Sequence, residues 1–98
     1  MKKSLILHEA AKLEYLDAKY YYSFQYVQLG TSFKTEILSA LEYIRLFPEI
    51  GADIDHGIKR FLVNRFPFSI FYKIYPTQIV VFAIASHHRE PNYWTKRF

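Results

Sequence analysis

The first third of the chain places apolar residues at helical spacing. A short apolar stretch over residues 3–8 predicts an initial strand. Beyond it, apolar positions recur at steps of four, three and four residues, namely Ala11, Tyr15, Ala18 and Tyr22. Residues with this spacing share one face of a helix. We therefore predict a helix over residues 8–29.

A second helix is predicted directly after the first. Gly30 is expected to end the first helix, because glycine readily adopts the positive φ found at helix C-termini. Thr31 and Ser32 can cap the start of the next helix. Its predicted apolar face consists of Phe33, Ile37, Ala40, Leu41 and Ile44. Pro48 ends this run, since the residue before a proline disfavours the α conformation.

The second half of the chain has the patterns of strands. Residues 51–57 are expected to form a loop, and residues 58–65 and 69–75 read as strands separated by Phe66-Pro67-Phe68. In the latter strand, Ser69, Phe71, Lys73 and Tyr75 should point away from Ile70, Tyr72 and Ile74. Residues 79–85 are nearly all apolar, as in a strand buried on both faces. Residues 91–98 are expected to add a helical turn.

These elements predict an α+β fold in one domain spanning residues 1–98. The three consecutive strands would form an antiparallel meander, because their connections are short. Its apolar face would be covered by the N-terminal strand and the αα-hairpin, since two amphipathic helices must bury their apolar sides. A chain of 98 residues suits a single modest core.

Charge is distributed unevenly along this chain. Its net charge is +4, but residues 1–55 hold six basic and eight acidic side chains, whereas residues 56–98 hold seven basic and one acidic. The two parts therefore carry −2 and +6. The basic second part is expected to meet either a polyanion or an acidic protein, or simply to provide a soluble surface.

The absence of cysteine excludes several kinds of chemistry. With no cysteine, the chain has no disulfide framework, thiolate nucleophile or cysteine zinc site. The cytoplasm is thus the expected compartment.

The apolar run Leu5-Ile6-Leu7 is too short for a signal-peptide core or a membrane span, so no membrane association is expected. Three glycines cannot make a phosphate loop or a dinucleotide fingerprint. The loop with Asp53, Asp55 and His56 lacks EF-hand spacing, so no cofactor and no metal are expected.

Residues 86–94 hold the side chains best suited to chemistry. A metal-free cleavage of RNA needs a base, an acid and a cation near the phosphate. His87 or His88 could supply the base or acid, and Arg89, Arg60 and Lys73 could hold phosphate charge. Tyr93 and Trp94 could stack on a base. Each has a plainer alternative: the histidines and Arg60 or Arg65 could be surface groups, and the two aromatic residues could close the core.

A set of residues in a characteristic order is spread over almost the whole chain. It consists of Ala11, Glu14, Ala18, Tyr21, Tyr22, Gly30, Phe33, Ala40, Leu41, Ile44, Pro48, Arg60, the run Phe66-Pro67-Phe68-x-Ile70-x-Tyr72, and the run Ile84-Ala85-x-His87-x-Arg89-x-Pro91-x-Tyr93-Trp94. In these residues the chain resembles the RelE/ParE superfamily of toxins from type II toxin–antitoxin systems. The resemblance implies a helix hairpin on a twisted antiparallel sheet. It also implies a cognate antitoxin that neutralises the toxin, and the basic second part suits an acidic partner.

The superfamily includes two activities, messenger RNA cleavage on the ribosome and inhibition of DNA gyrase. If the chain is a metal-independent mRNA endoribonuclease, the candidate catalytic residues are His87, Arg89 and Tyr93. The resemblance implies Arg89 as a basic residue and Tyr93 as the aromatic residue near the C-terminus, and His87 is the candidate base or acid. Among the candidate contacts to RNA or another target, Arg60 matches a basic position of the nuclease members. Arg65, Lys73 and Trp94 are candidates from their charge or aromatic ring. Leu62 and Ser69 stand where a nuclease can carry Lys and Arg, which weakens the nuclease hypothesis. The alternative outside the toxins is a non-toxic RNA- or protein-binding module with a basic sheet face.

Overall fold

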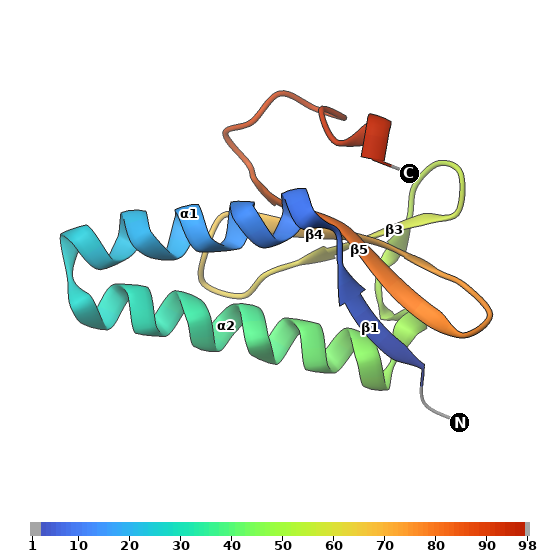
Figure 1. The fold of residues 1–98 in the computed structure, drawn as a ribbon, viewed down its shortest axis with the longest axis horizontal. Helices are drawn as coiled ribbons and strands as arrows, with labels where there is room; N and C mark the ends of the chain where they lie inside the picture. The colour runs from blue at the N-terminus through green and yellow to red at the C-terminus, as the bar shows by residue number, and fades with distance from the viewer. Residues whose placement is uncertain (1–2, 98) are drawn as a thin grey trace.

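The chain folds as two helices packed on one five-stranded sheet, which confirms the predicted α+β class (Figure 1). The computed structural model describes residues 3–97. In chain order the elements are β1 (Ser4–Leu7), α1 (Glu9–Gln25), α2 (Val27–Leu46), η1 (Pro48–Ile50), β2 (Ala52–Asp53), β3 (Ile58–Leu62), β4 (Phe68–Ile74), β5 (Gln78–Ser86) and η2 (Thr95–Arg97). The last of these is the helical turn expected in the C-terminal residues.

The sheet is mixed rather than wholly antiparallel. Its strand order is β1-β5-β4-β3-β2, with β3, β4 and β5 forming the expected antiparallel meander. β1 pairs in parallel with residues 78–81 of β5, because the helix hairpin carries the chain back across one face of the sheet. The expected loop at residues 51–57 contains the two-residue strand β2, which pairs with β3. Strand β5 therefore lies inside the sheet and is buried on both faces, as its apolar run predicts.

The helix boundary predicted at Gly30 is wrong. The first helix ends at Gln25. Tyr26 is the single extended residue that joins α1 to α2, and its backbone N–H donates to the Tyr22 carbonyl. Gly30 lies inside α2, where a Cβ would stand 1.9 Å from the Ser23 hydroxyl oxygen. Glycine is thus needed here for close helix packing rather than for a positive φ. Thr31 does not cap α2; its hydroxyl donates to the Val27 carbonyl within the helix.

The main core lies between the helices and the sheet. Phe33 of α2 is fully buried at its centre, and its ring contacts those of Tyr15, Tyr22, Phe66 and Phe68. A smaller cluster occupies the opposite face of the sheet, where the C-terminal tail, residues 87–97, crosses it. The sheet thus has a helix face and an outer face, and the tail covers only part of the outer face.

The three consecutive tyrosines of α1 do not all pack between helix and sheet. Tyr22 packs against Phe66 and Phe68, whereas Tyr20 and Tyr21 are exposed. Three adjacent residues cover most of a helical turn, so only one of them can face the sheet. Within residues 3–97, no helix is long and apolar enough to cross a membrane.

Candidate functional site

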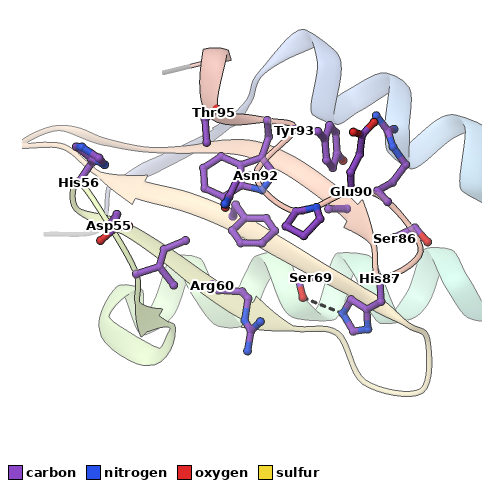
Figure 2. A pocket seen from close by; sticks show the side chains of 16 residues that line it. Asp55, His56, Arg60, Ser69, Ser86, His87, Glu90, Asn92, Tyr93 and Thr95 are labelled. Atoms are coloured by element: carbon purple, nitrogen blue, oxygen red, sulfur yellow. Dashed lines mark hydrogen bonds between the residues drawn. The ribbon is translucent and has the colours of Figure 1, made fainter.

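A cleft of about 500 Å³ opens on the outer face of the sheet (Figure 2). Its floor is formed by β3, β4 and the end of β5, and its walls by the loop before β3 and by the tail. Most of the candidate site residues line it, namely Arg60, His87, Arg89, Tyr93 and Trp94. The structure thus brings together side chains that are up to 34 positions apart in the sequence.

His87 and Ser69 are joined at one side of this cleft. The Ser69 Oγ lies 2.9 Å from the His87 Nε2, the contact drawn as a dashed line in Figure 2. Ser69 is 2% exposed and belongs to β4, so a rigid strand orients the imidazole of His87. His88 instead lines a separate hollow beside α1. Of the two adjacent histidines, His87 is the one that faces the cleft.

Arg60 reaches the cleft from the neighbouring strand. It pairs in register with Phe71, two residues along β4 from Ser69, which puts Arg60 and Ser69 on the same face of the sheet. Arg60 is exposed, and no ion pair to it is found among residues 3–97. Its guanidinium is therefore available to an anionic ligand. Leu62 and Ser69 also pair in register, so two neutral side chains stand next to this cation.

Tyr93 and Arg89 form the tail side of the cleft. The Tyr93 hydroxyl donates a hydrogen bond to the Glu14 carboxylate, and the Arg89 guanidinium lies 3.8 Å from the centre of the Tyr93 ring. Burial raises the pKa of the Tyr93 phenol far above its ordinary value, and the hydrogen bond and charge of Glu14 raise it further. Arg89 and Arg97 lower this pKa by a smaller amount. The Tyr93 hydroxyl therefore keeps its proton and donates it in a hydrogen bond to Glu14, so it is not available as a free acid.

Trp94 closes the smaller core cluster. Its side chain is 4% exposed, and its ring stacks on Phe71 with 4.4 Å between centroids. Because the indole is almost fully buried and stacked on Phe71, its faces are not open to a nucleic-acid base in this conformation. Of the two roles considered for Trp94, the packing role is the one that this geometry fits.

Arg65 and Lys73 lie outside the cleft. Arg65 belongs to the turn between β3 and β4, and its guanidinium lies 3.5 Å from the Glu36 carboxylate on α2. The Lys73 ammonium lies over the Tyr75 ring, 5.5 Å from its centre. Lys73 does share the outer face, as the strand alternation predicts, but at the far end of β4 from Ser69.

Part of the basic charge of the second half is neutralised by acids of the first half. Lys59 pairs with Asp53 at 2.7 Å and with Glu49 at 3.2 Å, and Arg97 pairs with Glu14 at 3.0 Å. Hydrogen bonding to Asp53 is the main cause of the raised pKa of Lys59. The charge asymmetry of the sequence therefore becomes, in the fold, a smaller basic area that includes Arg60 and Arg89.

Two residues of the site were missed as contributors by the sequence analysis. Strand alternation places Ser69 on the outer face and the resemblance marks it as a neutral replacement, but neither predicts that Ser69 orients His87. Glu14 was noted only within the resemblance, yet it holds Tyr93. Nothing in the local sequence indicates a contact between residues 79 positions apart. Among residues 3–97 no group of three or more His, Asp or Glu could hold a metal ion.

The fold has a counterpart among solved structures. No protein-family model and no curated protein matches the chain. A chain in the structure of the chromosomal ParDE TA system from P. aeruginosa is similar, with a TM-score of 0.76 and 16% sequence identity, over 87% of this chain and 96% of that chain. At this identity the similarity establishes a common fold. The chain therefore has the α+β fold of a protein from a ParDE toxin–antitoxin system.

Proposed function

We propose that this chain is the toxin of a type II toxin–antitoxin pair and acts in the cytoplasm, where it arrests growth. The observation that carries the proposal is the fold shared with a chain of a ParDE system over 87% of the length. The RelE/ParE resemblance of the sequence supports it independently, because the residues that carry it lie in both helices, the sheet and the tail. The cleft on the outer face, with Arg60 and His87, is the proposed contact area for the target.

A cognate antitoxin is the proposed protein partner. The helices leave large apolar side chains uncovered on α1, namely Leu13, Leu16, Tyr20 and Phe24, which lie at helical spacing. A groove of about 640 Å³ between α2 and β3 is also mostly apolar and includes Leu38, Tyr43 and Leu46. Exposed apolar areas of this kind usually mark a protein interface. An antitoxin that covers them would account for their exposure in the isolated chain.

DNA gyrase is the target that the site favours. A nuclease of the superfamily can carry cations where this chain has Leu62, which is 56% exposed, and Ser69, which is bound to His87. The Tyr93 phenol is held by Glu14 and the Arg89 guanidinium is stacked on Tyr93. Two positions that can be cationic in a nuclease are thus neutral in this chain, and the Tyr93 phenol is held by Glu14 rather than free to act as an acid. A toxin that binds its target without cutting it agrees better with this arrangement.

The first experiment measures growth and gyrase activity together. Induction of the chain alone should arrest growth, and co-expression of the cognate antitoxin should relieve the arrest. The purified chain should inhibit DNA supercoiling by gyrase in a dose-dependent way, while message isolated from the arrested cells carries no new cleavage ends. Harmless induction of the intact chain would favour the non-toxic binding module instead.

Messenger RNA cleavage remains the second candidate because of one feature of the cleft. His87 is oriented by Ser69 at 2.9 Å, on the face where Arg60 is also available. Such an imidazole could accept a proton from a ribose 2′-hydroxyl while the guanidinium stabilises the phosphate charge. Cleavage ends on ribosome-bound message that disappear with His87→Ala, together with unimpaired supercoiling, would establish this activity and exclude gyrase as the target.

A further inference from the structure

One carboxylate, that of Glu14, connects three separate parts of the chain. It lies on α1 and its side chain is 15% exposed. Its oxygens accept hydrogen bonds from the backbone N–H of Ile84 in β5 at 3.0 Å, from the Tyr93 hydroxyl, and from the Arg97 guanidinium at 3.0 and 3.1 Å. A helix, a strand edge and the tail therefore meet at a single side chain.

These contacts supply hydrogen-bond partners at the edge of the sheet beyond the end of β1. β1 pairs with residues 78–81 of β5, but β5 continues to Ser86. Beyond the end of β1, the Ile84 N–H donates to Glu14 and the Phe82 carbonyl accepts from Arg97 at 3.0 Å. Buried backbone groups at a sheet edge need hydrogen-bond partners. The Glu14–Arg97 pair supplies the partners that one more residue pair of a strand would supply.

The same side chain fixes the wall of the cleft. The Tyr93 ring, held by Glu14 through its hydroxyl, carries the Arg89 guanidinium on its face, and Trp94 follows it in sequence and packs on Phe71. A second hollow of about 370 Å³, lined by Glu14, Arg89 and Tyr93 among others, lies between the tail and α1. The tail therefore separates the cleft from this second hollow. The hydrogen bond from Tyr93 to Glu14 attaches the tail to α1, and Figure 2 shows Tyr93 beside this helix.

A partly buried ion pair by itself says little about stability, because the loss of hydration offsets much of the attraction. Glu14 differs from an isolated pair in that three of its four hydrogen bonds go to the tail and the fourth to the strand edge that the tail covers. We infer that Glu14 is a positioning residue that keeps the tail closed over the β5 edge and thereby sets the shape of the cleft. Its effect on toxicity rests on the proposed function, whereas its effect on the tail does not.

The test uses Glu14→Gln and the single tryptophan of the chain as a probe. Glutamine retains the shape and a carbonyl acceptor but loses the charge that holds Arg97. Trp94 is 4% exposed, so an opened tail should shift its emission to longer wavelength and make it accessible to acrylamide. Exchange of the Ile84 and Arg97 amide hydrogens should become roughly ten- to a hundredfold faster, as expected when charge-assisted hydrogen bonds are lost. Exchange at Ile70 and Tyr72 in β4 should stay unchanged.

Glu36→Gln is the matched control. The Glu36 side chain is 17% exposed and also lies opposite an arginine, but it connects α2 to the turn that holds Arg65 and not to the tail. This variant should leave the Trp94 emission as in the parent chain. A protected Trp94 in Glu14→Gln would overturn the inference, and so would an increase in exchange that includes β4, since that would indicate a merely structural role.

Arg97→Met provides a second variant that removes the other half of the pair. It should open the tail in the same way, and the double variant should be no more open than either single variant, because both act on one attachment. Effects that simply add would contradict the inference.

A growth measurement distinguishes the role of Glu14 in the tail from the proposed function as a toxin. Glu14→Gln should arrest growth more weakly than the parent chain at equal protein level. Full arrest with an opened tail would refute the role in shaping the cleft. A parent chain that arrests nothing, in a protein whose tail still opens with Glu14→Gln, would refute the proposed function alone.

Discussion

The two faces of the sheet differ in how they are covered and in what they leave free. On the helix face, α1 and α2 cover a continuous aromatic and aliphatic cluster in which Phe33, Ile37 and Tyr72 are fully buried. On the outer face, a tail without regular structure over most of its length covers a cluster of five buried residues and leaves a cleft beside it. The difference indicates that the helix face supplies most of the stability, while the outer face is free to hold charged side chains.

The largest expected effect is on the helix face. Phe33→Ala removes a fully buried ring that contacts four other rings. The lost burial and the remaining cavity should lower the free energy of unfolding by roughly 3–5 kcal/mol. Urea unfolding followed by circular dichroism measures this change. A loss below about 1 kcal/mol would show that the helix face is not the main source of stability.

A smaller loss is expected from the outer face. Trp94→Ala removes the indole that stacks on Phe71. The transfer of a large apolar side chain to water corresponds to about 2 kcal/mol, and the tail can move to fill part of the space, so the cavity should add little. The same unfolding measurement applies. If Trp94→Ala is as destabilising as Phe33→Ala, the two faces contribute equally and the comparison is wrong.

The smallest expected effect is a change in alkaline stability. Burial raises the pKa of Tyr93 above its ordinary value, so the protonated phenol favours the folded state. This contribution is complete below about pH 10, the pKa of an unfolded tyrosine, and is lost as the pH rises toward the folded-state pKa. Stability should therefore fall above pH 10, and it should fall less steeply in Tyr93→Phe.

Tyrosines of the helix face also contribute to the loss of stability at alkaline pH. Their contribution is the reference against which the effect of Tyr93→Phe is measured. Burial is the first cause of the raised pKa of Tyr15, Tyr22 and Tyr72 as well. Tyr93→Phe should thus retain part of the decline in urea midpoint between pH 9 and pH 11. Identical declines in the two proteins would mean that the phenol of Tyr93 does not stabilise the outer face.

The periodic segments of the fold could be predicted from the sequence, and the connections could not. Strand β5 is uniformly apolar because both faces are buried, and the alternation in β4 follows from one covered and one partly open face. The helix junction was missed because Tyr26 carries no turn signal and because Gly30, which resembles one, serves close packing against Ser23. The parallel pairing of β1 depends on the path of the hairpin across the sheet, which no local pattern records.

The sequence predicts which kinds of residues the candidate site contains, but not which of them lie together in the fold. His87, Arg60 and Arg89 do line one cleft, and strand phase correctly assigns Ser69 to the same face. Arg65 and Lys73 were grouped with them on charge alone, which cannot distinguish a cation beside an acid of α2 from one in the cleft. The contact of Glu14 with the tail depends on the full fold and on the way in which the tail returns over α1.

The central claim is that the outer face carries the function and the helix face the stability, and growth arrest by the double variant Arg60→Ala/His87→Ala tests it most directly. Both residues are exposed, but His87→Ala also removes the hydrogen bond to Ser69, so the variant should lose about 1–2 kcal/mol of unfolding free energy and stay folded. At equal protein level it should no longer arrest growth, whereas Lys34→Ala, which alters an exposed cation on α2, should arrest growth fully. Arrest by the double variant equal to that of the parent chain would contradict the claim.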